Sequence, residues 1–519
     1  MFKYLLFENQ LQDSEYNSEP EDKLLYKDLN LDIIIAELCK ITKDYPVSYI
    51  RKMNKNQDIA VFRNEIFKEF LCCDILDTVE KICIEISMLK NKYDHVLKLT
   101  DELQSKIANI YVLHSYFELI DKIVEFLSSF KSAGIKKAIE LFDGYLKQLE
   151  TESVRRKVVA AKDLLDCYFN LSFELDRSCK KINFFSENLE NSPFLTNLDS
   201  LSRDLTGVSI IKPFSIVSNE NLMHLEEYAL KYISSIHNDL RECLSEIPEI
   251  SLIWNDLLSF KIQISFYYAH LKLIKKLQQK GLPFCFPNFD RSVRVVGSGL
   301  YDLSLGVLNL ENESFKMTMN DISIIPETFG FILTGANQGG KTTFLRSVGL
   351  SCYLAMCGCP VPASEITIYP YRSIYSFFYS EEVNESGSSR FEREARLYVS
   401  QYQKFDESSL ILFNEFFVGT NRVEGVGILK QSIIDLITKK STFAYVTHFQ
   451  EIYTILGGDV NNRIQYLKVK VSEGLGNRRI YKIQKGLPDG RAYSESITAG
   501  YGLTYDGLTE LFRNNRGDK

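Results

Sequence analysis

Apolar residues recur at steps of three and four through most of the first 280 residues, which is the spacing of an amphipathic helix. Ile107, Ile110, Leu113, Phe117 and Ile120 are one such stripe. Only four of the 27 glycines precede residue 290, and scarce glycine favours long helices because it is costly in their interior. We therefore predict a helical region from about residue 29 to 280, with its last helices over 219–247 and 251–280.

The pattern changes after residue 280. Two prolines and a glycine in the segment GLPFCFP (281–287) stop the helix. Beyond it, short apolar runs alternate with helical stretches, as expected of buried parallel strands. We expect strands at Phe329–Leu333, Leu410–Phe413 and Phe443–Val446, and a β-hairpin formed by residues 466–471 and 479–483. The sequence thus predicts an acidic N-terminal segment (1–28), an all-α helical domain (29–282) and an α/β domain (283–519).

Composition and charge narrow the functional classes. Of the 519 residues, 45% are hydrophobic and 25% charged, which is typical of a globular protein. The net charge of −7 gives no global attraction to nucleic acid, so DNA contact would need a local basic cluster. Two clusters are candidates, with a solvated helix face as the alternative: Arg155, Arg156, Lys157 and Lys162, and Lys272, Lys275, Lys276 and Lys280. The absence of a signal peptide and of a long apolar run predicts a cytoplasmic protein without membrane contact.

The strongest chemical motif is GANQGGKT (335–342), which lies between a predicted strand and the predicted helix Phe344–Leu354. Glycines in such a loop, here Gly335, Gly339 and Gly340 with Asn337 among them, let backbone N–H groups converge on phosphate oxygens. The following helix N-terminus adds positive potential. Lys341 is expected to reach the β- and γ-phosphates, and the Thr342 hydroxyl to ligate Mg²⁺. The sequence thus predicts an ATP site.

Two later strands end in polar residues suited to ATP hydrolysis. Asn414-Glu415 follows the second strand, where a P-loop ATPase carries Asp-Glu. Glu415 is therefore the candidate general base. Asn414 can still accept a hydrogen bond from a water bound to Mg²⁺, but it brings one negative charge fewer than Asp. This substitution predicts weaker Mg²⁺ binding and slower turnover. The third strand ends in Thr447-His448, which puts His448 at the same sheet edge, where it can contact the γ-phosphate.

Together these motifs resemble the MutS family of ATPases, best known from DNA mismatch repair. TGANQGGKTT (334–343) is similar to the family's TGPNMGGKST and adds Thr343 to the ATP site. CGCPVPA (357–363) resembles the G-x-x-V-P-A element, and SGSSRFERE (386–394) resembles S-G-x-S-x-F-x-x-E. In the family the second serine of that last motif reaches the nucleotide of the other subunit, and Ser389 matches it. The resemblance therefore implies a homodimer with composite ATP sites.

The resemblance also implies a fold and a function. It identifies the helical region with the family's core and lever helices, and the C-terminal region with its ABC-type P-loop NTPase domain. We expect no counterpart of the family's mismatch-reading domain in this sequence. The first hypothesis is a MutS-like ATPase that uses ATP and Mg²⁺ to rearrange helical arms on DNA other than a mismatch, in repair or recombination. The alternative is a nucleotide-gated dimeric scaffold that hydrolyses little ATP and recruits a protein partner without DNA.

Overall fold

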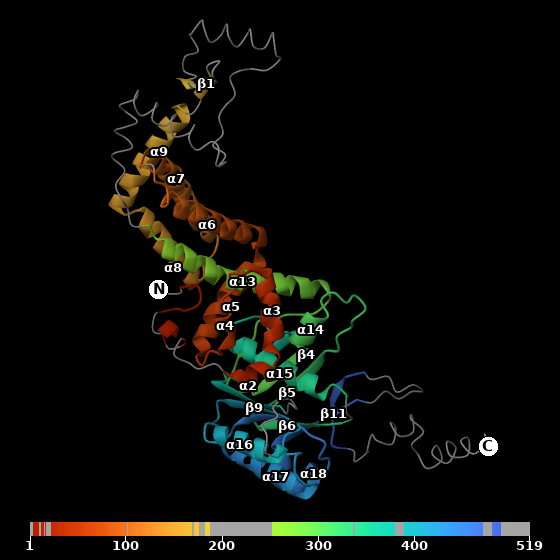
Figure 1. The fold of residues 1–519 in the computed structure, drawn as a ribbon. Helices are drawn as coiled ribbons and strands as arrows, with labels where there is room; N and C mark the ends of the chain where they lie inside the picture. The colour runs from red at the N-terminus through yellow and green to blue at the C-terminus, as the bar shows by residue number, and fades with distance from the viewer. Residues whose placement is uncertain are drawn as a thin grey trace, which may run out of the picture. The chain divides into compact units, whose positions relative to one another are not determined.

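The computed structural model describes most of the chain, in segments separated by gaps (Figure 1). The described residues are 4–9, 12–14, 16, 22–100, 102–168, 171–175, 182–186, 252–335, 338–378, 389–470 and 480–488. The predicted helix over 219–247 and the turn of the C-terminal hairpin lie outside them. The chain divides into two compact units, residues 77–261 with Met1, and residues 2–76 with 262–519.

The first unit is helical in its described part, apart from one small sheet. Its elements are α6 (Leu76–Val96), α7 (Glu102–Leu127), α8 (Ala133–Leu146), α9 (Leu149–Tyr168), β1 (Leu171–Leu175), β2 (Ile182–Ser186) and the first residues of α13 (Trp254–Gln279). The stripe predicted for α7 is buried from Ile107 to Ile120. However, β1 and β2 pair antiparallel, so the prediction of an all-α region is wrong at these ten residues. Apolar and polar residues alternate in β1 (LSFEL), and β2 (INFFS) is rich in aromatic and β-branched residues. Both features favour strands over helix.

The second unit joins N-terminal helices to two sheets. Its helices are α2 (Lys23–Asp28), α3 (Leu31–Ile41), α4 (Ser48–Arg51), α5 (Gln57–Cys72), the rest of α13, α14 (Leu303–Leu308), α15 (Lys341–Met356), α16 (Arg390–Tyr402), α17 (Arg422–Thr438), α18 (Ile452–Leu456) and α19 (Gly458–Asn461). Its strands are β3 (Asn288–Phe289), β4 (Val295–Leu300), β5 (Asn320–Ile324), β6 (Gly330–Thr334), β7 (Glu365–Ile368), β8 (Ser373–Phe378), β9 (Ser409–Asn414), β10 (Thr442–Val446), β11 (Ile464–Val469) and β12 (Ile483–Lys485). A helical N-terminal region followed by mixed α/β sheets is thereby confirmed.

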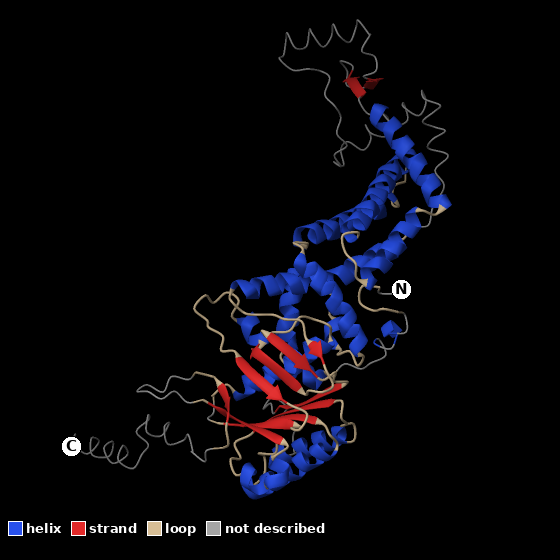
Figure 2. Cartoon of the chain, turned by 180° about the vertical axis from the view of Figure 1, so that it is seen from behind, coloured by secondary structure: helices blue, strands red, loops and turns tan. Residues whose placement is uncertain are grey.

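The larger sheet has the order β12-β11-β6-β10-β9-β8. All neighbours are parallel except β11 and β12, which pair antiparallel as in the predicted hairpin. The second strand begins at Ile483, however, the last residue of the predicted range 479–483. The three predicted core strands are β6, β9 and β10, and they are buried along almost their whole length because helices cover both faces. α17 packs with β9 and β10 in one hydrophobic core, while α15 contacts the same two strands as well as α5 and β4 (Figure 2). The smaller sheet has the order β3-β7-β4-β5.

The N-terminal residues pack against the α/β half of the chain, which the predicted boundary at residue 282 does not anticipate. Arg63 of α5 is fully buried, and its guanidinium donates to the carbonyl oxygens of Leu6 and Cys357, at 3.0 and 2.9 Å. Asn54 donates to the Met356 carbonyl, and the Tyr353 hydroxyl donates to that of Ile50, both at 2.8 Å. The three contacts with Tyr353, Met356 and Cys357 span about 300 positions of sequence, so local patterning carries no sign of them.

Candidate functional site

The predicted phosphate-binding loop lies between β6 and α15, in the order that the motif requires. Gly335 and Gly340 have φ angles of +146° and +86°, which residues with a Cβ rarely adopt. A Cβ on Gly335 would also lie 2.7 Å from Val469 Cγ2. Gly340 is the N-cap of α15, so this helix begins at Lys341. Gly339 is buried beside Gly340, whereas Asn337 lies outside the described residues.

Lys341 and Thr342 occupy the first turn of α15. The Lys341 side chain is 4% exposed, and its Nζ donates to the Gly335 carbonyl at 3.0 Å. Burial lowers the pKa of Lys341, while the Glu415 carboxylate opposes that shift. The Thr342 hydroxyl donates to Asn414 Oδ1 at 3.0 Å. The structure thus brings the loop and the end of β9 together, as the sequence predicts.

Glu415 and His448 meet at the same sheet edge because β9 and β10 are parallel neighbours, with Asn414 in register with Val446. Glu415 Oε1 lies 2.6 Å from His448 Nε2 and 3.9 Å from Lys341 Nζ. The His448 hydrogen bond lowers the pKa of Glu415, burial opposes this, and the charges of His448 and Lys341 add to the lowering. Glu415 also has a left-handed φ of +52°, a strained conformation that often occurs at functional sites.

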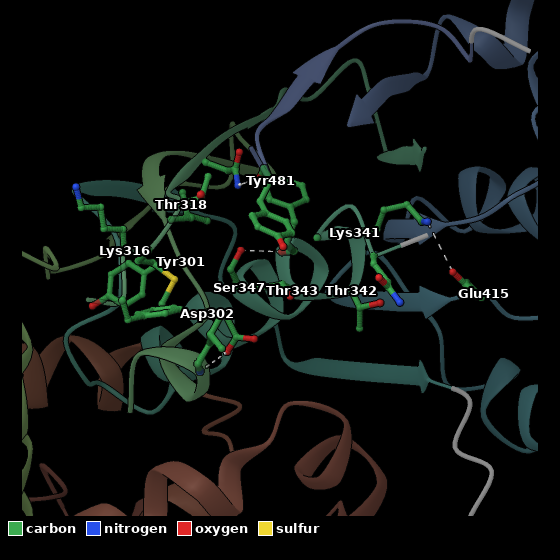
Figure 3. A pocket seen from close by; sticks show the side chains of 18 residues that line it. Tyr301, Asp302, Lys316, Thr318, Lys341, Thr342, Thr343, Ser347, Glu415 and Tyr481 are labelled. Atoms are coloured by element: carbon green, nitrogen blue, oxygen red, sulfur yellow. Dashed lines mark hydrogen bonds and ion pairs between the residues drawn. The ribbon is translucent and has the colours of Figure 1, made fainter. Parts of the chain in front are cut away.

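A cavity of about 440 Å³ adjoins these residues (Figure 3). Figure 3 shows Glu415 facing Lys341 on one side, and Tyr301, Asp302 and Lys316 on the other. Its full lining is Leu300, Tyr301, Asp302, Leu305, Phe315, Lys316, Met317, Thr318, Asn320, Gln338, Gly340, Lys341, Thr342, Thr343, Phe344, Ser347, Glu415 and Tyr481. The cavity therefore has Lys341 and Glu415 on one side, and its wall includes larger apolar and aromatic side chains such as Tyr301, Phe315 and Tyr481.

Ser389 lies at the N-terminus of α16, where its hydroxyl oxygen accepts a hydrogen bond from the Glu392 amide at 3.2 Å. Within the described residues it is not part of the cavity lining of its own chain. Its neighbour Arg390 donates to the Glu415 carbonyl at 3.1 Å and to Glu394 Oε1 at 2.9 Å. α16 is thereby attached to the backbone of the candidate base, while the Ser389 hydroxyl stays at the helix end.

Among the residues near the site that were not anticipated from sequence are Phe315, Arg390 and Tyr481. Tyr481 has a φ of +51°, and its ring borders the position that a Cβ on Gly340 would occupy, at 3.3 Å. Asn320 holds it there by donating to the Tyr481 carbonyl at 3.2 Å. Phe315 and Tyr481 come from segments far from the loop in sequence, so only the fold identifies them. The sequence did contain a signal for Arg390, because this residue lies within the motif that contains Ser389.

The oxygen atoms at the loop are suited to Mg²⁺. Thr342 Oγ1 and Asn414 Oδ1 are neutral oxygen donors 3.0 Å apart, and hard cations prefer oxygen ligands. Mg²⁺ usually takes only one or two protein ligands and keeps several waters when phosphates complete its shell. The described residues contain no group of three or more His, Cys, Asp or Glu side chains placed to hold a metal.

Most side chains of the two predicted basic clusters have partners within their own unit. In the cluster on α13 and just after it, Lys275 pairs with Asp74 at 3.5 Å and Lys276 with Glu37 at 3.3 Å, and Lys280 donates to the carbonyls of Asn309 and Asn312 at 3.3 Å. In the other cluster the ion pairs are Arg155 with Asp121, Arg156 with Glu152, and Lys162 with Asp166. This pairing favours the alternative of solvated helix faces.

The fold and the site define a class: a helical region joined to an α/β domain that carries a phosphate-binding loop motif. Comparison with known proteins agrees. Residues 331–498 match the family model of MutS domain V. The chain is 32% identical over 304 residues to Endonuclease MutS2 of Shouchella clausii, which covers 56% of this chain and 35% of that protein. It is also 24% identical over 469 residues to DNA mismatch repair protein MutS of Petrotoga mobilis. That match covers 82% of this chain and 53% of the Petrotoga protein.

The match to MutS domain V and these two relatives, all at partial coverage, support a MutS-family protein. The chain spans only about a third to a half of the length of these curated relatives. Among the described residues, no helix combines the length and apolar character needed to cross a bilayer.

Proposed function

We propose that this protein is a MutS-like ATPase with an ABC-type P-loop NTPase domain, and that it acts on DNA as a homodimer in repair or recombination. The observation that carries the proposal is the convergence of three separate segments: Lys341, Thr342 and Glu415 line one cavity, and His448 lies 2.6 Å from Glu415. The similarity to the MutS family supports the DNA-related part. A cytoplasmic location stays a prediction.

Each residue has a role that follows from its contacts. The phosphates lie against the backbone N–H groups of the loop and the positive end of α15. Lys341 exchanges its bond to the Gly335 carbonyl for phosphate oxygens, which a buried cation favours. Phe315 and Tyr481 give the base an apolar wall. Thr342 and Asn414 would hold Mg²⁺, which neutralises phosphate charge when bound.

The chemistry of hydrolysis falls to Glu415. Its carboxylate polarises the attacking water, and its side chain is 34% exposed, so that water can reach it. His448 orients the carboxylate through the 2.6 Å contact and keeps it ionised. Ser389 of a second chain would complete the site, as the family motif implies. The dimer is therefore part of the proposal.

One experiment tests this function against the scaffold alternative. ATP hydrolysis is measured at fixed salt with no DNA and with duplex, branched and single-stranded DNA, for the native chain and for Lys341→Ala. We expect DNA to stimulate hydrolysis, and Lys341→Ala to weaken ATP binding about tenfold or more because a charge-assisted contact is lost. ATP binding without turnover or DNA binding would favour the scaffold. Absence of ATP binding would contradict both.

Asn414 gives a further prediction about the metal. Asn414→Asp adds a negative charge at 3.0 Å from the Thr342 hydroxyl, so we expect half-maximal hydrolysis at severalfold lower Mg²⁺ and a higher kcat, since charge is the main term in Mg²⁺ affinity. The measurement is a Mg²⁺ titration at saturating ATP. Unchanged Mg²⁺ dependence and kcat would show that Asn414 does not face the ion.

A further inference from the structure

The turn between α2 and α3 lies against the helix that follows the phosphate-binding loop. Leu29 is fully buried, and a Cβ on Gly349 of α15 would lie 2.8 Å from Leu29 Cδ2 and 2.6 Å from Leu412 Cδ1. α15 is thus in close contact with the N-terminal turn on one side and with β9 on the other. Asn30 takes a left-handed φ of +53° and donates to the Ser304 hydroxyl at 3.3 Å. The turn therefore also contacts α14.

Arg346 connects this turn to the wall of the cavity. It lies on α15, five positions after Lys341. Its Nε donates to the Asp28 carbonyl at 3.0 Å, and its Nη1 donates to Asp302 Oδ2 at 3.2 Å. The guanidinium thus donates hydrogen bonds to two different segments of the chain. It can do so because its donors are arranged in a planar fork. The pair is well shielded from water, because the side chains of Arg346 and Asp302 are 18% and 1% exposed.

Asp302 is both a lining residue of the cavity and the cap of α14. Its Oδ1 accepts from the Ser304 amide and hydroxyl, at 3.0 and 2.6 Å. One carboxylate oxygen therefore fixes the start of α14, while the other is held by Arg346. A shift of Arg346 would leave a buried carboxylate oxygen without its cation, which is costly in a shielded site. The wall of the cavity and the N-terminal turn therefore depend on the same guanidinium.

Asp28 extends the same set of contacts to the edge of the large sheet. Its buried carboxylate accepts from the Phe378 amide at 3.2 Å. Phe378 is the last residue of β8, the strand that precedes the segment containing Ser386 and Ser389. Asp28 thus contacts β8 through its side chain and Arg346 through its main chain.

We propose that Arg346 is a positioning residue that couples the N-terminal helices α2 and α3 to the nucleotide cavity through Asp302. The proposal rests on the proposed function of the cavity as an ATP site. Nucleotide binding is expected to hold α15 and Asp302 in one arrangement, and thereby to stabilise the docked turn at Leu29 and Asn30. Coupling between binding equilibria is reciprocal, so loosening the turn must weaken nucleotide binding to the same degree.

Amide hydrogen exchange of residues 23–41, with and without a β,γ-imido analogue of ATP and Mg²⁺, tests the coupling in the full chain. We expect the analogue to slow exchange in these residues in the native protein. In Arg346→Gln, the affinity for the analogue is expected to fall about fivefold, the lower end of typical coupling, and the exchange response to disappear. Arg291→Gln is the matched control, because Arg291 is exposed and outside the cavity lining; it should behave as the native chain.

Arg346→Lys provides a second variant that keeps the charge beside Asp302. A single ammonium group cannot serve both acceptors in the same way, so we expect a partial exchange response that lies between those of the native chain and Arg346→Gln. This variant also decides the question if Arg346→Gln does not fold. A native chain that binds the analogue without any change in exchange at 23–41 would overturn the coupling, as would a native response in either variant. A native chain that binds no nucleotide would instead overturn the proposed function.

Discussion

Glu415→Gln is expected to reduce ATP hydrolysis about 10²- to 10⁴-fold, the range typical for loss of a general base, while ATP still binds. The amide cannot take a proton from water, yet it fills the same volume beside His448 and Lys341. Binding should persist because the backbone N–H groups of the loop do not depend on the carboxylate, and its ion pair with Lys341 is long, at 3.9 Å. Single-turnover hydrolysis and equilibrium binding of ATP, measured on the same sample, separate the two effects.

Glu407→Gln is the matched control, since Glu407 is an exposed glutamate just before β9. It should hydrolyse ATP at the native rate. If Glu415→Gln also retained the native rate, Glu415 would not be the base and the mechanism proposed above would be wrong.

The pH dependence of hydrolysis gives an independent measure of the same carboxylate. Its pKa is lowered from the ordinary 4.5, chiefly by the His448 hydrogen bond. The base is therefore ionised above that lowered pKa and is lost only as the pH falls through it. Any contribution of this pairing to stability follows the same direction, because a group with a lowered pKa stabilises the folded state above its unfolded pKa. His448→Ala removes the main cause, so the acid limb of the pH–rate profile should move to higher pH.

Gly330→Ala is expected to destabilise the α/β unit by about 3 kcal/mol, the upper part of the usual range for overpacking. Gly330 begins β6, between β10 and β11. A Cβ there would lie 2.1 Å from the Phe443 carbonyl oxygen and 2.7 Å from Cγ of its ring. The carbonyl belongs to a buried central strand, which can move only if the sheet separates. Because β6 leads directly into the loop, ATP binding should weaken as well.

A glycine-to-alanine substitution at another position of the same unit should stabilise the protein instead. Gly427 lies within α17, and a Cβ added to it would meet nothing within 4 Å. Gly427→Ala should stabilise by about 0.5–1 kcal/mol, because alanine is the better helix former. Urea unfolding of both variants beside the native chain measures the two changes. Equal effects of the two substitutions would show that the approach of Phe443 to Gly330 is not tight.

Much of the site could be predicted because its motifs are local. Residue type and order are enough to identify three of its parts: the loop at 335–342, the strand that ends in Asn414-Glu415, and the strand that ends in His448. The rule that parallel strands bring their carboxyl ends to one edge was enough to predict that these residues meet. The roles of Glu415, His448, Asn414 and Ser389 remain predictions, since they depend on a nucleotide and, for Ser389, on a second chain.

The predicted domain boundary and the predicted DNA contacts had weaker local signals. Helix α13 does end just before the break predicted at 281–287. However, residues 2–76 pack with the α/β half, which lies several hundred positions later in the sequence. Side chains that seemed to form basic clusters are largely paired with acids on neighbouring turns or helices. Periodicity and charge runs describe one segment at a time, so neither reveals what a segment packs against.

By itself the sequence determined the class of chemistry, the strands and helices around the loop, and the resemblance to the MutS family. These features depend on backbone preferences and on short spacings between residues, both of which can be read from local sequence. Only the tertiary structure decided that Tyr481 borders the loop, that Arg390 binds the Glu415 backbone, and that Arg346 joins Asp28 to Asp302. Each of these contacts arises where distant segments are brought within hydrogen-bonding or van der Waals distance, and such closeness is a property of the packed chain.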